Sequence, residues 1–297
     1  MAEQGNPRDS SKITREYLDS LLVEMRHIDA VEPSTKLELY GAFFDTPVML
    51  AALSHLTKTH PGGMVEAARG VHAAGAVMWA GMGDEAELEA ITATGAKTIK
   101  IIKPYADNRV IFKKIEHAEK CQCLAVGMDV DHAFGSKTAR GAVLGNPMAP
   151  KTLEEIRGFV KATGLPFIVK GVLSEQDAQK CLDAGVGGIV VSHHHGIVDY
   201  ALPPLRILPR IVKVINRHIP IFVDCCVDRG MDAFKALALG AAAVSTGRAI
   251  MEPLKTGGAE GVRKVFAEMT AELNWAMAVT CSPDISHIDP SIIWPQA

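Results

Sequence analysis

The sequence lacks the segments by which proteins cross or enter membranes. It has no run of about 18 apolar residues, and its N-terminus has no apolar stretch typical of a secretory signal. It also lacks an excess of positive charge, since the formal net charge is −3 at pH 7. A basic surface for nucleic acids or anionic lipids is therefore not expected. We predict a soluble, cytoplasmic protein with neither a nucleic acid nor a membrane as partner.

Cysteines are few and follow no pattern typical of a zinc site. The six cysteines have no paired spacing of that kind, and two of them, Cys225 and Cys226, are adjacent. Adjacent cysteines rarely form a disulfide, so this pair is expected to pack as two small side chains. Reduced thiols are typical of cytosolic proteins, which agrees with the predicted location.

The chain does have a regular alternation of short apolar runs and helical segments. The apolar runs are almost continuous, as in parallel strands that are buried on both faces. Eight such strand–helix units predict a (β/α)₈ TIM barrel, an α/β fold, as a single domain with a short N-terminal helical extension. The predicted strands cover residues 48–53, 76–80, 98–102, 124–128, 167–170, 189–191, 220–224 and 243–246. Helices are predicted over 13–27, 63–74, 85–94, 108–120, 205–217, 230–239 and 261–278.

Capping signals and loop lengths divide the chain further. Thr152 and Glu155 form a capping box that opens one helix, and Ser174 caps another that Gly185 closes. The connection 129–151 is too long for a plain loop and predicts a lid or binding segment, with disorder as the alternative. We assign residues 1–45 to an N-terminal extension that includes a hairpin over 37–44, residues 46–280 to the barrel and 281–297 to a tail.

A lysine stands at the end of a buried strand, where barrel enzymes place their chemistry. Lys170 closes the apolar run 167–170, and a buried ammonium is costly unless it is paired. It has two explanations: an ion pair with Asp129 or Asp224 in the barrel mouth, or a cation beside an anionic cofactor ring.

The next strand ends in Ser192 and three consecutive histidines. Adjacent residues point in different directions, so at most two of the three rings can face one site. This favours a histidine acting as a general base over a metal site, and no metal is predicted. After the last strand, Gly247 and Arg248 suit a phosphate, because glycine allows close approach and guanidinium pairs with its oxygens. A surface salt bridge of Arg248 is the alternative.

Several segments together resemble the FMN-dependent α-hydroxy acid oxidases and dehydrogenases, the group of glycolate oxidase, lactate oxidase and flavocytochrome b2. The similarity covers about residues 25–280, is strongest over 165–275, and is that of a divergent member. The segments that carry it are Pro47–Ala51, Ile168–Val172, Ile189–His194, Asp199–Ala201, Phe222–Asp224, Asp232–Ala241 and Thr246–Arg248.

The resemblance implies an FMN cofactor, a small-molecule substrate and an assembly of identical subunits. It implies that His194 takes the proton of the substrate hydroxyl, that Asp129 stabilises the protonated histidine, and that Lys170 lies near the reduced flavin ring. The implied cofactor-binding residues are Ala51, Ala52, Lys100, Lys170, Ser192, Asp224, Cys226, Arg229, Gly247 and Arg248.

The chain departs from the family mainly on the substrate side. His195-Gly196-Ile197 stands where the family has its carboxylate-binding arginine, and Ile102 or Lys103 stands near the place of its tyrosine. In the phosphate motif, two glycines and an arginine are replaced by Cys225, Cys226 and Asp228. Candidate replacement cations are Lys137, Arg140, His193 and His195.

These departures leave the substrate less defined than the cofactor. We therefore predict an FMN-dependent oxidoreductase that acts on a 2-hydroxy acid or a related alcohol, with an electron acceptor that the sequence does not identify. A flavin-dependent isomerase and a barrel without flavin that acts as a binding protein are the alternatives.

Overall fold

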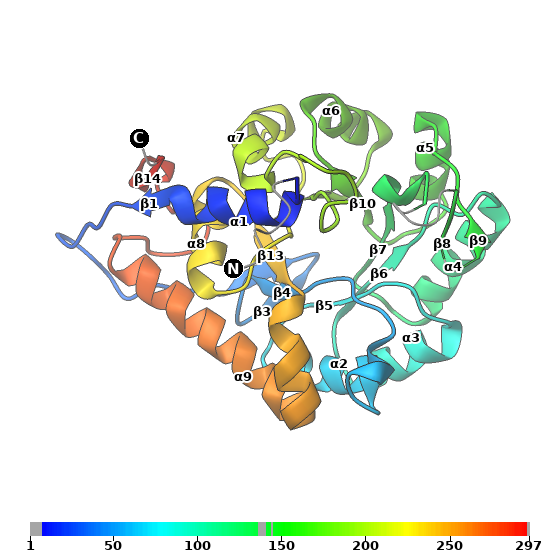
Figure 1. Cartoon of the computed structure of the whole chain (residues 1–297), viewed down its shortest axis with the longest axis horizontal. Helices are drawn as coiled ribbons and strands as arrows, with labels where there is room; N and C mark the ends of the chain where they lie inside the picture. The colour runs from blue at the N-terminus through cyan, green and yellow to red at the C-terminus, as the bar shows by residue number, and fades with distance from the viewer. Residues whose placement is uncertain (1–7, 136–140, 144, 296–297) are drawn as a thin grey trace, which may run out of the picture.

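The computed structural model describes residues 8–135, 141–143 and 145–295, and this part of the chain contains a closed barrel (Figure 1). Leu50 N donates to Val77 O at 3.0 Å and Gly81 N to Leu53 O at 2.9 Å, which joins the two ends of the sheet. The predicted (β/α)₈ barrel is confirmed. Its parallel strands, in spatial order, are β4 (Val48–Leu50), β13 (Ala243–Thr246), β12 (Ile221–Val223), β11 (Gly188–Val191), β10 (Phe167–Val172), β7 (Ala125–Asp129), β6 (Thr98–Ile102) and β5 (Met78–Ala80).

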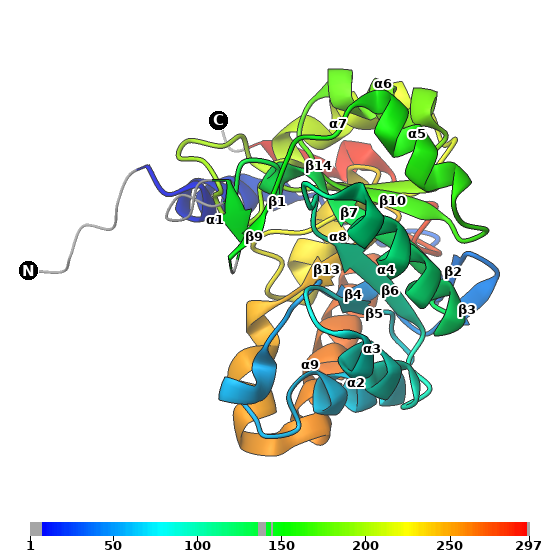
Figure 2. The same cartoon turned by 90° about the vertical axis from the view of Figure 1, so that its right-hand side faces the viewer.

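Helices follow the strands and form the outer layer (Figure 2). The predicted capping signals are confirmed: Thr152 and Glu155 form the capping box of α5, and Ser174 Oγ accepts from the N–H of Asp177 at the start of α6. Gly185 ends α6 with a φ of 75°, a left-handed conformation that glycine adopts at little cost. The helices are α2 (Gly63–Ala73), α3 (Glu85–Thr92), α4 (Asn108–Lys120), α5 (Leu153–Lys161), α6 (Glu175–Ala184), α7 (Pro204–Ile215), α8 (Gly230–Ala238) and α9 (Met251–Ala278).

Successive side chains of each strand alternate, so that one set fills the inside of the barrel and the other set packs on its outside. Ile99 and Ile101 of β6 lie in the inner cluster, where Trp79 and Phe222 meet edge to face at 5.4 Å. Ile102 lies in the outer cluster, together with the apolar faces of the helices. Because successive residues of a strand point to opposite faces, this alternation decides which side chains reach the barrel mouth.

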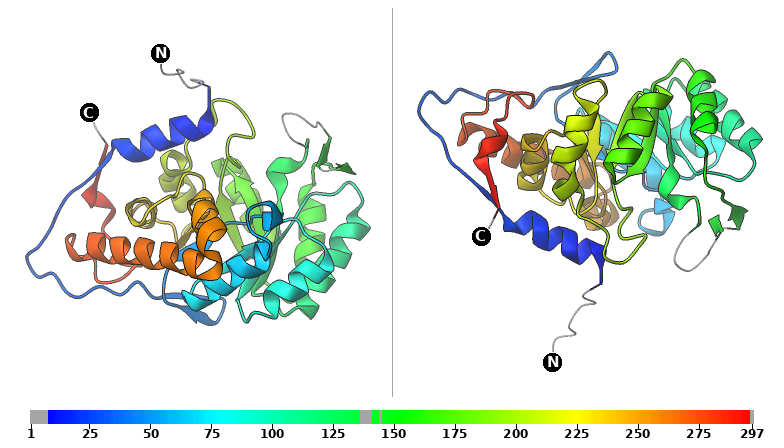
Figure 3. Two further views of the ribbon diagram at one scale, coloured as in Figure 1. Left: turned by 60° about the horizontal axis from the view of Figure 1, so that its bottom comes forward. Right: turned by 90° about the horizontal axis from the view of Figure 1, so that it is seen from above.

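The two ends of the chain pack against each other beside the barrel, which differs from the sequence-based expectation. The first helix, α1, is Ser10–Ser20 rather than 13–27, because Leu21–Val23 forms strand β1 and pairs with Ile293–Pro295, strand β14 (Figure 3). The cap also shifts the start, since Asp9 accepts a hydrogen bond from the N–H of Ser11. Long-range strand pairing therefore ends α1 and holds the C-terminal segment.

Two further segments test the predicted boundaries. The predicted hairpin is confirmed, with strands β2 (Leu37–Leu39) and β3 (Ala42–Phe44). The last helix begins at Met251, ten residues before the predicted 261, because it continues through a break at Gly258, whose φ is 54°. A glycine in the sequence predicts a helix boundary, because it readily takes the left-handed conformation. Here the chain resumes its helix after Gly258 and packs against α2 (Figure 3).

The long connection after β7 has structure of its own. It begins with a 3₁₀ turn, Val130–His132, and returns through the short strands β8 (Ala142–Val143) and β9 (Asn146–Pro147). The candidate cations Lys137 and Arg140 lie outside the described residues. Among the helices of the described chain, none has the length and apolar character needed to span a bilayer.

Candidate active site

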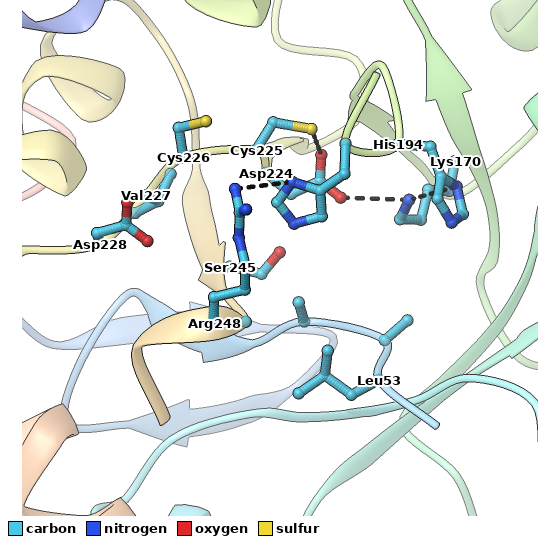
Figure 4. Close-up of a pocket in the computed structure, with 14 residues that line it drawn as sticks. Leu53, Lys170, His194, Asp224, Cys225, Cys226, Val227, Asp228, Ser245 and Arg248 are labelled. Atoms are coloured by element: carbon cyan, nitrogen blue, oxygen red, sulfur yellow. Dashed lines mark hydrogen bonds and ion pairs between the residues drawn. The ribbon is translucent and has the colours of Figure 1, made fainter. Parts of the chain in front are cut away.

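A cavity of about 110 Å³ lies at the carboxyl ends of the barrel strands (Figure 4). Its walls come from the ends of β4, β10, β12 and β13 and from the loop after β11. This is the end of the barrel at which loops from many strands converge, and where barrel enzymes carry their active sites. The lining residues are Ala51, Ala52, Leu53, Lys170, His194, His195, Asp224, Cys225, Cys226, Val227, Asp228, Ser245, Gly247 and Arg248.

Lys170 is buried at the base of this cavity between two carboxylates. Its ammonium lies 3.3 Å from Asp129 Oδ1 and 3.2 Å from Asp224 Oδ2, and Ser192 Oγ is 3.4 Å away. Burial alone would lower the pKa of Lys170, but Asp224 and Asp129 outweigh it and raise that pKa well above its usual range. The ammonium is therefore permanently charged and fixed in place.

Asp129 is bound mainly by lysines. Lys103 Nζ donates to its Oδ2 at 2.5 Å, and Lys170 is its second cation. Burial would raise the pKa of Asp129, yet Lys170 and Lys103 hold it well below its usual range. His194 Nδ1 is 3.7 Å from Asp129 Oδ1, which is beyond hydrogen-bond distance. The predicted support of His194 by Asp129 is thus an electrostatic contact in this structure.

His194 has two nearer partners, both from the 3₁₀ turn after β7. Its Nδ1 lies 3.2 Å from each carboxylate oxygen of Asp131, and its Nε2 lies 2.9 Å from Nε2 of His132. The backbone of His194 is left-handed, with φ 49°, and its N–H donates to Ser192 Oγ at 3.0 Å. Sequence reasoning gave Asp131 and His132 no role. Their position two and three residues after Asp129, at a strand end, was the available signal.

The two neighbouring histidines face other partners. His193 is buried, with Nε2 2.7 Å from Thr14 Oγ1 of α1 and Nδ1 accepting from Gly196 N at 2.9 Å. His195 Nδ1 accepts from Arg248 Nη2 at 3.2 Å, and burial together with Arg248 lowers the pKa of His195 to about 4. The expectation that the three rings point in different directions is confirmed.

The loop after β12 is held from outside the barrel by α1. Arg15 donates to Cys226 O at 3.0 Å and makes two bonds to the buried carboxylate of Asp232, at 2.8 and 2.9 Å. Cys225 and Cys226 have φ values of 71° and 59°, a left-handed conformation that normally favours glycine. Their positions are the ones at which the related family has glycines. The loop therefore keeps a glycine-like path with cysteine side chains, and the anchoring arginine was missed in the sequence.

Two of the predicted cofactor residues lie away from the cavity. Lys100 Nζ donates to Gly81 O at 2.5 Å from the outer face of β6, and burial, followed by Lys114, lowers its pKa to about 8. Because successive side chains of a strand alternate between its faces, Lys103, three residues further on, is the lysine that reaches the barrel mouth and pairs with Asp129. Arg229 is 63% exposed and pairs with Glu272 of α9 at 3.2 Å, so it also points away.

The cavity has the donors that a flavin nucleotide needs. Lys170 supplies a buried cation at one end and Arg248 an exposed guanidinium at the other. A Cβ on Gly247 would stand 3.5 Å from Ala51 Cβ, so the missing side chain of Gly247 leaves space at this wall of the cavity. The free volume is below the 300–1,000 Å³ of typical cofactor sites, and His195 and Arg248, which both line the cavity, contact each other at 3.2 Å. The charges and donors of these residues fit FMN.

The whole chain is similar to known FMN-dependent proteins. The family of FMN-dependent dehydrogenases matches residues 4–152 and 136–295. A 2-hydroxyacid oxidase of Dictyostelium discoideum is 29% identical, with 93% of this chain and 79% of the relative covered. A peroxisomal (S)-2-hydroxyacid oxidase of Arabidopsis thaliana is 30% identical over 90% of this chain and 82% of its own.

Solved structures of mandelate oxidase match in fold as well as in sequence. One superposes with a TM-score of 0.88 at 27% identity and covers 96% of this chain and 90% of its own. Another is a mandelate oxidase variant with a C4a-OH-FMN adduct. It has the same TM-score and 28% identity, and it covers 96% of this chain and 91% of its own. The expected FMN cofactor is thereby supported. The chain belongs to the FMN-dependent dehydrogenase family and is an FMN-dependent oxidoreductase of the α-hydroxy acid oxidase and dehydrogenase type.

Proposed function

We propose that this enzyme oxidises a 2-hydroxy acid, or a closely related alcohol, with His194 as the base. The observation that carries the proposal is the setting of His194, whose Nδ1 lies beside the carboxylate of Asp131 and the buried ammonium of Lys170, while its Nε2 faces His132. A carboxylate on Nδ1 holds that nitrogen as the N–H, so that Nε2 is left with the lone pair that takes a proton. The named activities of the relatives support the same reaction class.

Each charged group at the base of the cavity has a definite task in this proposal. FMN, when bound, would supply the acceptor for the hydride of the substrate carbon. Lys170 keeps a fixed positive charge beside the ring system, and Asp224 and Asp129 hold its ammonium in position. His194 Nε2 receives the hydroxyl proton, and the nearby Asp131 carboxylate stabilises the imidazolium that forms.

The opposite end of the cavity is assigned to the phosphate. Arg248 presents its guanidinium there, and the backbone N–H groups near Gly247 and Cys226 are the accompanying donors. Asp228 also lines this end and opposes a phosphate by its charge. A charge-assisted bond from Arg248 is worth about 1.5–3 kcal/mol, more than a solvent-screened repulsion from one aspartate. Ala51 and Ala52 form the wall against the other edge of the flavin.

The test is anaerobic reduction of the bound flavin by a panel of 2-hydroxy acids that includes glycolate, L-lactate and (S)-mandelate. Flavin bleaching by at least one of them is expected, and His194→Asn should lower that rate by roughly 10²–10⁴-fold. His117→Asn, on the outer helix α4, is the control and should leave the rate unchanged. Bleaching at the wild-type rate in His194→Asn would remove His194 as the base.

The same experiment separates the alternative reaction classes. An isomerase would convert its substrate with no net flavin reduction, and a flavin-free binding protein would be colourless after purification. The family relationship favours the oxidoreductase over both. Oxygen consumption during turnover then tests molecular oxygen as the electron acceptor. The homo-oligomer and the cytoplasmic location remain predictions, to be checked by light scattering and by fractionation of the producing cells.

A further inference from the structure

The contacts around His194 form a line of hydrogen bonds in which Nδ1 carries the proton, because the Asp131 carboxylate at 3.2 Å is a nearer partner of Nδ1 than the Lys170 ammonium at 3.4 Å. Asp131 accepts from Nδ1–H of His194, which leaves Nε2 of His194 as an acceptor. The group 2.9 Å from that acceptor is Nε2 of His132, so His132 must carry its proton on Nε2. Its Nδ1 then has a lone pair only, which agrees with the finding that this buried atom has no hydrogen-bond partner among the described residues.

The same three side chains, Asp131, His132 and His194, also have the composition of a metal site. Their ligand atoms lie within 4.8 Å of one another, and two histidines with one carboxylate are a common ligand set for divalent metals. The ammonium of Lys170, however, lies 3.4 Å from His194 Nδ1, and Lys103 is a second cation of the same cluster. A divalent cation on these ligands would stand close to the fixed ammonium of Lys170, so we favour the hydrogen-bonded line.

The line has a consequence for substrate binding. The proposed function requires the substrate hydroxyl to reach His194 Nε2, which is the atom that His132 N–H caps in this structure. When the hydroxyl takes that place, the displaced N–H of a part-buried ring needs a new acceptor, because an unpaired donor costs about 1–3 kcal/mol. In a 2-hydroxy acid the carboxylate oxygens are close to the hydroxyl oxygen, since the two groups share one carbon.

We propose that His132 is a substrate-binding residue, whose Nε2–H moves from His194 to the acid group of the substrate when the substrate hydroxyl binds His194. This proposal rests on the proposed function and goes beyond it, because it gives the acid group of the substrate a binding partner. The chain has His195-Gly196-Ile197 where the related family has its carboxylate-binding arginine. Burial, followed by His194, lowers the pKa of His132 to about 4, so its ring is a neutral donor at pH 7. In the same arrangement Asp131 is the residue that positions His194.

Steady-state and single-turnover kinetics with (S)-mandelate, or with glycolate if mandelate is not oxidised, separate the two roles. His132→Ala should raise KM about tenfold to a hundredfold and change the limiting rate of flavin reduction by less than about threefold. His132→Gln keeps an N–H donor and should recover part of the loss. Asp131→Asn should lower the limiting rate and change KM little, and Asp131→Glu should restore part of the rate. The FMN absorption spectrum should stay unchanged in all four variants.

Imidazole ¹⁵N spectra of the FMN-loaded protein test the proton assignment without turnover. At pH 7 the wild type should show a protonated Nε2 on His132 and an unprotonated Nε2 on His194. Benzoylformate, a 2-oxo acid that cannot be oxidised by the same step, should shift the His132 resonance and leave that of His218 on the far surface unmoved.

The outcomes keep the two proposals apart. A wild-type protein reduced by no 2-hydroxy acid contradicts the proposed function, whatever the spectra show. A wild type that is reduced normally, with unchanged KM in His132→Ala or with the His132 proton on Nδ1, overturns the assignment of His132 alone.

Discussion

Arg248 and Arg229 are both arginines beside the phosphate end of the cavity, and their side chains have different surroundings. Arg248 lines the cavity and is engaged there only by the neutral ring of His195, among the described residues. Arg229 turns to α9 and pairs with Glu272. A cofactor phosphate can displace a neutral imidazole from Arg248 at small cost, whereas Arg229 would first have to leave a carboxylate.

Arg248→Ala is therefore expected to weaken FMN binding by roughly tenfold to a hundredfold, the equivalent of one charge-assisted hydrogen bond of about 1.5–3 kcal/mol. Titration of the apoprotein with FMN, followed by quenching of flavin fluorescence, measures the change in Kd. Arg229→Ala is the matched control and should leave Kd within about twofold. An equal loss in the two variants would show that Arg229 rotates toward the phosphate when FMN is bound.

Helix α1 is the element that ties the N-terminal segment to the active site. It reaches the loop after β12 through Arg15 and the loop after β11 through Thr14, which contacts His193. Ser10 Oγ also bonds the backbone of the β11 loop, donating to Val198 O and accepting from Ala201 N. Because the bonded residues lie about 180 to 220 positions apart in sequence, α1 stabilises the cavity walls only in the folded state.

Removal of Arg15 should be costly, because Asp232 is 1% exposed and would be left as a buried carboxylate with one backbone N–H. Breaking a buried pair costs about 3–5 kcal/mol, and since Arg15 itself is 29% exposed we expect about 2 kcal/mol for Arg15→Ala. Urea denaturation measures this loss of unfolding free energy, and FMN should also bind more weakly. Lys12→Ala removes an exposed ion pair with Glu16 from the same helix and should cost under 0.5 kcal/mol, a rough value for such pairs. Equal losses in the two variants would contradict the anchoring role.

The elements that sequence alone identified are those with a local signal. The buried strands and the capped helices α5 and α6 have such signals, and so does the lysine at the end of β10. The end of α1 was wrong because it depends on β14, more than 270 residues away. Lys100 turns to the outer face of β6 and donates to Gly81 O, a direction that follows from the register of the strand in the barrel. Asp131 and His132 lie in an irregular turn, whose side-chain directions follow no period, and Arg15 acts across the whole chain.

At the scale of the whole molecule, barrel closure brings charges from four different strand ends into one buried cluster. Lys103, Asp129, Lys170 and Asp224 alternate in sign along this cluster, so the four side chains sum to zero charge. Such a network is stable only while every member keeps its charge, since removal of one leaves a buried ion unpaired. Burial lowers the pKa values of His132 and His195 beside this cluster, because a further cation would be poorly solvated there.

The stability of the fold should therefore fall in mild acid before its carboxylates titrate. Burial and then His194 lower the pKa of His132 to about 4, and burial and then Arg248 lower the pKa of His195 to about 4. In the unfolded chain both values are about 6.5. Above pH 6.5 both rings are neutral in both states and contribute nothing. Between pH 6.5 and 4 the unfolded chain binds protons that the folded chain does not, so unfolding free energy decreases as the pH falls.

Each of these two histidines can account for at most roughly 3 kcal/mol over that range, and their partial exposure reduces the effect to about 1–2 kcal/mol each. Urea denaturation at pH 7.0, 5.5 and 4.5 should show the decrease, and His132→Gln combined with His195→Gln should flatten it. His287→Gln, whose ring is 73% exposed, is the control and should leave the slope as in the wild type. Below pH 4 the loss should steepen in all variants, because Asp129 and Asp224 have lowered pKa values and their protonation breaks the pairs with Lys170. A wild-type stability that is constant from pH 7.0 to 4.5 would mean that His132 and His195 become protonated in the folded state without cost, and the closed contacts of His132 with His194 and of His195 with Arg248 could not then persist in solution.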